Sequence, residues 1–173
     1  LGTAYAMSNH EDEATRELTR AAELLPEDSE VHLNLGGVFM LQDMYESAAR
    51  CFRKVVEIDP MDRLGYANLA AAYDVDKKYD EEIQVLKKIL MFAPEDIELR
   101  SALSTAYFNS ENYDEALNHA LCVIELDEKD PQAYCNLGSC YSAQNMVDEA
   151  VESFKKASEI DPDYSLPHTN LGS

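Results

Sequence analysis

Four asparagines recur at a fixed spacing and are the residues best suited to binding chemistry. Asn34, Asn68, Asn136 and Asn170 are separated by 34 residues or a multiple of 34, and Ala102 occupies the intervening place. Each carboxamide offers an acceptor and donors that match those of a peptide group. The column therefore predicts a surface that binds the main chain of an extended polypeptide, with little selection for its side chains.

The remaining reactive residues do not form a catalytic pattern. The four histidines fall in different segments of the chain: His10, His32, His119 and His168. No Gly-rich phosphate loop, HExxH motif or Ser-centred elbow occurs in the sequence. Acidic runs such as Asp80-Glu81-Glu82 are better explained as helix caps than as acid and base pairs. We predict a non-enzymatic protein with no cofactor and no metal site.

The same 34-residue period extends over the whole chain and predicts the elements that position the asparagines. We expect a single solenoid over residues 1–173. It comprises a partial repeat 1–28, full repeats 29–62, 63–96, 97–130 and 131–164, and a partial repeat 165–173. A repeat of this length buries its apolar side only against its neighbours, so several are needed for stability.

Each recurring residue type within the period has a mechanical reason. A Leu precedes a small residue, as in Leu35-Gly36 and Leu137-Gly138, which allows a second helix to approach closely. A second small position is Ala14, Ala48, Ala116 and Ala150, with Glu82 as the exception. A third recurring position is aromatic, and its members are Tyr5, Phe39, Tyr73, Tyr107 and Tyr141. A proline ends four of the repeats, at Pro26, Pro60, Pro94 and Pro162. Proline cannot continue a helix interior, so these prolines mark helix ends.

On these residues the chain closely resembles the tetratricopeptide repeat family. The resemblance implies an all-α fold, a right-handed superhelical solenoid of two antiparallel helices per repeat. It also implies that first helices line an inner groove that binds an extended peptide or a partner's helix. The asparagine column is similar to the one in the repeat superhelix of O-linked N-acetylglucosamine transferases, although Ala102 interrupts it here.

Helical spacing extends the candidate peptide-binding residues beyond Asn34, Asn68, Asn136 and Asn170. Met40, Leu41, Phe108 and Asn109 are directed toward the same inner face or its rim, where apolar side chains could anchor a ligand. Family members that bind acidic C-termini use Lys, Asn and Arg as a two-carboxylate clamp. No Lys stands at the corresponding positions here, so we predict that this clamp is absent.

The net charge of the chain limits the classes of molecule that it could bind. The 34 acidic and 14 basic residues give a net charge of -20, which argues against nucleic acid and against an anionic membrane surface. We expect a neutral or basic protein or peptide partner. The four cysteines show no paired spacing, which favours a reducing, cytoplasmic location, and no apolar run is long enough for a membrane span.

These observations favour a protein-interaction scaffold, with two alternatives left open. The sequence opens within a repeat, so the chain is expected to be a fragment, and it could be the regulatory or targeting region of a larger enzyme such as a glycosyltransferase. It could also form homo-oligomers, because Leu1 and Tyr5 at one end and Leu166 and Leu171 at the other would expose apolar stacking faces.

Overall fold

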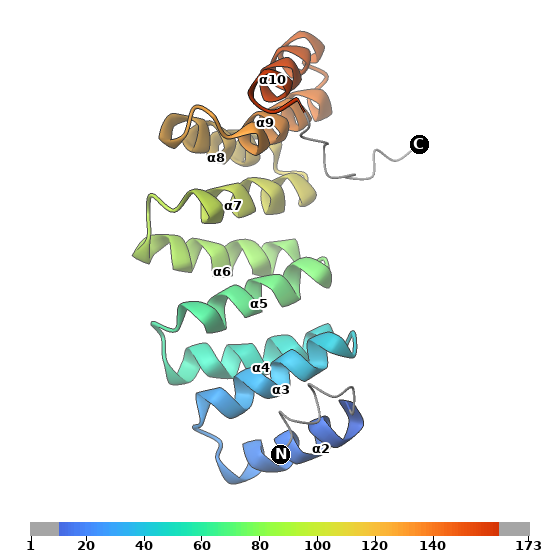
Figure 1. Cartoon of the computed structure of the whole chain (residues 1–173), viewed down its shortest axis with the longest axis vertical. Coiled ribbons are helices and arrows are strands. Elements are labelled where there is room, and N and C mark those ends of the chain that lie inside the picture. Colours follow the sequence, from blue (N-terminus) through green and yellow to red (C-terminus); the bar gives the residue numbers. More distant parts are fainter. Residues whose placement is uncertain (1–10, 163–173) are drawn as a thin grey trace. The chain divides into compact units, whose positions relative to one another are not determined.

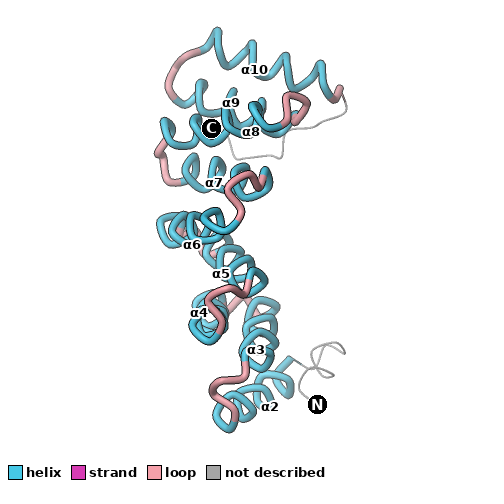
Figure 2. Tube along the Cα trace, turned by 90° about the vertical axis from the view of Figure 1, so that its left-hand side faces the viewer, coloured by secondary structure: helices cyan, strands magenta, loops and turns pink. Residues whose placement is uncertain are grey.

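The computed structural model describes residues 11–162, and every regular element in this range is a helix (Figures 1 and 2). The helices are α2 (Glu11–Leu24), α3 (Ser29–Leu41), α4 (Tyr45–Ile58), α5 (Arg63–Val75), α6 (Tyr79–Phe92), α7 (Ile97–Asn109), α8 (Tyr113–Leu126), α9 (Pro131–Ala143) and α10 (Val147–Ile160). The 34-residue period is confirmed, because each full repeat supplies two helices. Expectations for Asn170, for His10 and His168, and for the four terminal stacking residues lie outside the described range.

The helices fall into two compact units, residues 1–89 and residues 90–173, with α6 contributing to both. Within the first unit, α3 contacts α2 and α4, and α4 contacts α5. Within the second, α8 contacts α7 and α9, and α10 packs against α9. A single solenoid over the whole chain stays a prediction. None of the described helices has the length and apolar character of a membrane span.

The acidic residues before the first helices act as N-caps. The side chain of Asp28 accepts hydrogen bonds from the main-chain amides of Glu30 and Val31, at 3.0 and 3.2 Å. Equivalent caps are Asp62, Asp96 and Asp130. These carboxylates satisfy amides that lack an intrahelical partner and lie at the positive end of the helix dipole. They therefore fix where each first helix begins.

The short turn inside each hairpin contains a residue with left-handed backbone geometry. These residues are Asp43, Lys77, Glu111 and Asn145, with φ angles of 57°, 57°, 62° and 61°. Left-handed geometry costs roughly 1–2 kcal/mol for a residue with a Cβ, although Asn and Asp tolerate it better. This geometry lets the main chain reverse direction within a short turn. Because none of these four residues is glycine, the turns are strained.

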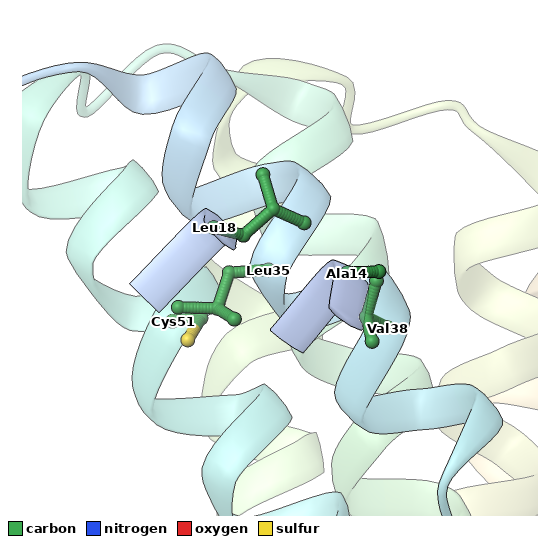
Figure 3. Packing of buried hydrophobic residues seen from close by; sticks show 5 residues of the cluster. All are labelled: Ala14, Leu18, Leu35, Val38 and Cys51. Atoms are coloured by element: carbon green, nitrogen blue, oxygen red, sulfur yellow. The ribbon is translucent and has the colours of Figure 1, made fainter. Parts of the chain in front are cut away.

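A core cluster joins α2, α3 and α4. It contains Ala14 and Leu18 of α2, Leu35 and Val38 of α3, and Cys51 of α4, which converge at the helix contacts (Figure 3). Burying the Leu and Val side chains stabilises the packed helices by about 1.5–3 kcal/mol each relative to exposure. The small residue Ala14 lets α2 approach α3 closely, so the positions that recur in the sequence are the positions that pack.

Close approach within a hairpin depends on the small residue after the recurring Leu. A Cβ added at Gly36 would lie 2.5 Å from Cε1 of Phe52, and one at Gly138 would lie 2.7 Å from Cε1 of Phe154. Where the residue is Ser104, its hydroxyl donates a buried hydrogen bond of 2.8 Å to the carbonyl of Ala116. The hairpins of Gly36 and Gly138 therefore close by leaving out the side chain, and that of Ser104 by satisfying its polar atom.

Candidate functional site

Half of the predicted site residues lie on α3 and α5 in unit 1. We call the residues of these two helices that follow the helical spacing of the asparagines the unit 1 face. Its members on α3 are Asn34, Gly37, Met40 and Leu41, and those on α5 are Leu64, Ala67, Asn68, Ala71, Asp74 and Val75. The large apolar side chains Leu41, Leu64 and Val75 are 62%, 56% and 48% exposed. The space above Gly37 is open, because nothing lies within 4 Å of an added Cβ.

Asn34 and Asn68 occupy equivalent places on the unit 1 face and are both half-buried. Neither carboxamide makes a side-chain hydrogen bond to another described residue. A carboxamide anchored at its stem, with donor and acceptor unused, is ready to bind a polar group from outside the chain. The predicted residues Met40 and Leu41 end α3, and Met40 is the more buried of the two.

The corresponding surface of unit 2 is formed by α7 and α9 and differs in its polar groups. Phe108 is half-buried and packs on Tyr113 with ring centroids 5.5 Å apart. Thr105 and Ser139 donate to carbonyls in their own helices, at 3.1 and 2.9 Å. Asn109 is half-buried at the end of α7. These two hydroxyl donors are thus already used within their own helices.

Asn136 differs from Asn34 and Asn68 because a neighbour already binds it. Its Oδ1 accepts a hydrogen bond of 2.6 Å from Nε2 of Gln132, one helical turn earlier in α9. Its Nδ2 is buried and has no hydrogen-bond partner. A ligand would have to displace Gln132 to use the acceptor. Asn34 lies on α3 and Asn68 on α5, both within unit 1, whereas Asn136, Phe108 and Asn109 lie within unit 2.

A buried carboxyl borders the unit 1 face and was not among the predicted site residues. Glu82 in α6 is only 6% exposed, and its Oε2 has no hydrogen-bond partner. Burial, and secondarily the negative charge of Asp74, raises the pKa of Glu82 to about 8. The carboxyl is therefore largely protonated at neutral pH. The only sequence signal was the replacement of a recurring small residue by Glu.

The buried cysteine thiols serve packing. Burial raises the pKa values of the Cys51 and Cys140 thiols to about 11, and it also raises that of Cys135. A thiol with such a pKa is a poor nucleophile and metal ligand at neutral pH. Within residues 11–162, no three His, Cys, Asp or Glu side chains come together in a way that could hold a metal ion.

A cavity of about 600 Å³ in unit 2 belongs to helix stacking. Its lining includes Tyr134, Leu137 and Tyr141 of α9, together with polar side chains of α10. In the preceding repeat the equivalent residues Leu103 and Tyr107 are buried, and α9 contacts both α7 and α8 there. The cavity therefore corresponds to the place where a following helix would pack, so we do not assign it a ligand.

Solved structures share this fold. One described as "Crystal structure of MamA" has a TM-score of 0.80 and 23% identity, over 94% of this chain and 95% of that chain. A second, "Crystal structure of MamA protein", has a TM-score of 0.81 and 22% identity, over 96% of this chain and 93% of that chain. A third is described as "MamA 41-end from Desulfovibrio magneticus RS-1". It has a TM-score of 0.78 and 21% identity, over 95% of this chain and 93% of that chain. At these identities the likeness concerns the fold, which is an all-α helical-repeat solenoid.

Sequence comparison identifies the repeat itself. None of the curated protein sequences matches the chain. Two family models do match, both described as the tetratricopeptide repeat, one over residues 1–62 and the other over residues 131–164. Together these segments make up more than half of the 173 residues, and the repeats between them have the same helices and caps. The chain therefore contains tetratricopeptide repeats.

Proposed function

We propose that the chain is a non-catalytic protein-interaction scaffold that binds an extended or helical segment of a partner protein along its first helices. The observation that carries this proposal is the pair of unused carboxamides on the unit 1 face. Asn34 and Asn68 are held at equivalent places in successive repeats, with neither donor nor acceptor engaged among described residues. Each matches one peptide group of an extended chain.

Apolar contacts supply the rest of the proposed binding energy. Leu41, Leu64 and Val75 are largely exposed on the same face as the two asparagines. Covering such side chains contributes about 25 cal/mol per Å² of apolar surface removed from water. The open space above Gly37 would let a ligand main chain approach α3 closely. The partner segment would therefore be largely uncharged or basic, given the net charge of -20.

The second unit contributes to this proposal in a different way. Phe108 and Asn109 offer a further apolar contact and a further carboxamide on α7. Asn136 would first have to exchange its hydrogen bond with Gln132 for one with the ligand. Such an exchange gains little net free energy, since one hydrogen bond replaces another. We expect main-chain recognition to depend more on Asn34 and Asn68 than on Asn136.

The test is a screen of extended peptides, followed by changes to the ligand main chain and to the asparagines. N-methylation of alternate peptide groups in a bound peptide should weaken it about tenfold or more, because each lost hydrogen bond contributes about 0.5–1.5 kcal/mol. The double variant Asn34→Ala, Asn68→Ala should weaken the unmethylated peptide similarly. Asn118→Ala, at an exposed asparagine of the second helix α8, is the matched control and should have no effect. Unchanged binding by the double variant would contradict the proposal.

A further inference from the structure

The outward surface of α10 is exposed where the corresponding surface of an earlier second helix is buried. In α4 this surface includes Ala49 and Phe52, which are 3% and 2% exposed, and α5 packs against that helix. The equivalent residues of α10 are Val151, which is 45% exposed, and Phe154, which is half-buried. Val147, one turn earlier, is 65% exposed. The surface of α10 thus has the apolar character of a helix contact, although no described helix covers it.

Four residues form a continuous stripe on this surface, which we call the α10 stripe. Val147, Val151, Phe154 and Ser158 are spaced by four, three and four residues, which is the spacing of the seam in a pair of coiled helices. The Ser158 hydroxyl donates to the Phe154 carbonyl at 3.1 Å, so its polar atom is satisfied within the helix. A hollow of about 410 Å³ lies over the stripe, and its lining is Val151, Phe154, Lys155, Ser158 and Glu159.

Opposite charges flank one side of the α10 stripe. Asp148 directly follows Val147, and Lys155 directly follows Phe154, so the two charged residues are seven apart and lie on the same side. Both are exposed, and neither has a hydrogen-bond or ion-pair partner within residues 11–162. The other side of the stripe is formed by two small buried residues, Ala150 and Ala157. The stripe therefore has one charged flank, which is negative near the helix start and positive nearer its end.

This order of residues is self-complementary in one orientation. When a second α10 lies antiparallel on the first, Val151 of each copy faces Phe154 of the other. In antiparallel pairs each flank meets the same flank of the partner helix, so Asp148 meets Lys155 of the second copy, and the contact occurs twice. A parallel pair would instead set the charged flank against the alanine flank. Charge complementarity thus favours an antiparallel pair with two-fold symmetry.

We propose that the α10 stripe joins two copies of this chain in an antiparallel helix pair, with Asp148 and Lys155 paired across the interface. The apolar stripe supplies most of the affinity, and the charges set the orientation. One pair of helices is a small interface, so we expect a weak dimer with a dissociation constant of about 10–100 μM. The interface uses no residue of the unit 1 face. With the proposed peptide binding, the dimer would be a bivalent scaffold.

The first test is the mass of the full chain in solution as a function of concentration. Sedimentation equilibrium at physiological ionic strength should show a rise from the monomer toward twice its mass between low and high micromolar concentrations. Val151→Glu places a charge in the stripe and should weaken association at least tenfold, without loss of helix, because the residue is exposed. Leu126→Glu, the same kind of change at 44% exposure in α8, is the matched control and should leave association unchanged.

The second test exchanges the charges. Asp148→Lys and Lys155→Asp each create two like-charge contacts in a dimer, so each variant alone should associate about tenfold more weakly. An equimolar mixture of the two variants should form a heterodimer, because both contacts then pair opposite charges. The double variant should self-associate about as well as the original chain. Circular dichroism of each variant checks that α10 remains folded.

Four results would overturn the proposal. A chain that stays monomeric at the highest concentration would exclude the dimer. A dimer that survives Val151→Glu would use another surface, and a mixture of the charge variants without heterodimers would contradict the antiparallel pairing. A monomer that loses stability with Val151→Glu would show that the stripe is covered by other residues of the same chain. The peptide-binding proposal has its own test with N-methylated peptides, and none of these results bears on it.

Discussion

Two neighbouring hairpins, those of repeats 29–62 and 63–96, solve the same packing problem in opposite ways. In repeat 29–62 the helices meet at Gly36 and Ala48, where an added Cβ on Gly36 would collide with Phe52. In repeat 63–96 the corresponding pair is Ala70 and Glu82, both buried. The first hairpin removes atoms to bring its helices together, and the second buries a carboxyl at the same place. The fold tolerates both, so the difference must be sought in energetics.

The comparison shows that equivalent positions can differ in what they contribute to stability. A buried carboxyl is costly when ionised, and the raised pKa of Glu82 measures that cost. The pKa is about 8 in the folded chain, whereas a glutamate in water has an ordinary value of 4.5. The folded state therefore binds more protons between these values, and stability falls as the pH rises through this window. Repeat 29–62 has no such dependence at Ala48.

Transferring the carboxyl to the first hairpin should have the largest effect. Ala48→Glu places a carboxyl at a site with 0% exposure. At pH 9 the free energy of unfolding should fall by about 5 kcal/mol or more, since overpacking adds to the cost of ionisation. Chemical denaturation at pH 5 and pH 9 would check this, with a smaller loss expected at pH 5. Equal losses at the two pH values would mean that the carboxyl escapes to solvent.

The reverse exchange should stabilise the second hairpin at alkaline pH. Glu82→Ala removes an ionisation cost of about 5 kcal/mol but loses packing of two methylenes, about 2 kcal/mol, for a net gain of about 3 kcal/mol at pH 9. At pH 4.5 the gain should vanish or reverse, because the carboxyl is then largely neutral in the folded chain and costs little there. Denaturation across this pH range would measure it, and a pH-independent difference would show that Glu82 is solvated.

Two adjacent glycines test the close approach of the helices in repeat 29–62. Gly36→Ala should lower the free energy of unfolding by about 1–3 kcal/mol, because the new methyl group meets the Phe52 ring at 2.5 Å. Gly37→Ala is the matched control: nothing lies within 4 Å of its added Cβ. It should instead stabilise α3 by about 0.5–1 kcal/mol. Thermal unfolding of both variants tests the contrast, and changes of equal sign would contradict it.

The smallest effect is expected in the turn that leads to Glu82. Lys77 has a φ of 57°, so Lys77→Gly should relieve left-handed strain and stabilise the hairpin by about 0.5–1 kcal/mol after the entropy cost of glycine. Asn145→Gly should gain less, because Asn already tolerates this geometry. The melting temperatures of the two variants would rank them. A destabilised Lys77→Gly would indicate that the Lys77 side chain contributes packing.

The period of the sequence was sufficient to predict the helices. Leu35-Gly36 and Ala48 recur because helices pack there, and Asp28 recurs because it caps a helix, so each leaves a periodic signal. Glu82 shows where the period stops being informative. It marks a departure from the pattern, but whether the side chain turns outward or is buried depends on atoms that periodicity does not specify.

The sequence predicted which residues belong to the candidate site but not which of them are available to a ligand. Equivalent asparagines could be aligned from the sequence, but the hydrogen bond from Gln132 to Asn136 depends on a pair of neighbours that occurs in one repeat. The same sequence column therefore contains two carboxamides without partners in unit 1 and one already bound in unit 2. Which members of a column are available to a ligand is decided by local side-chain contacts.

The distribution of the cysteines offers a natural way to follow each unit separately. Cys51 is the one thiol in residues 1–89, and it is buried, as are Cys135 and Cys140 in the other unit. A thiol-reactive dye can modify such a group only when the surrounding helices open. The labelling rate at Cys51 would therefore time the breathing of the N-terminal hairpins alone, without any engineered reporter.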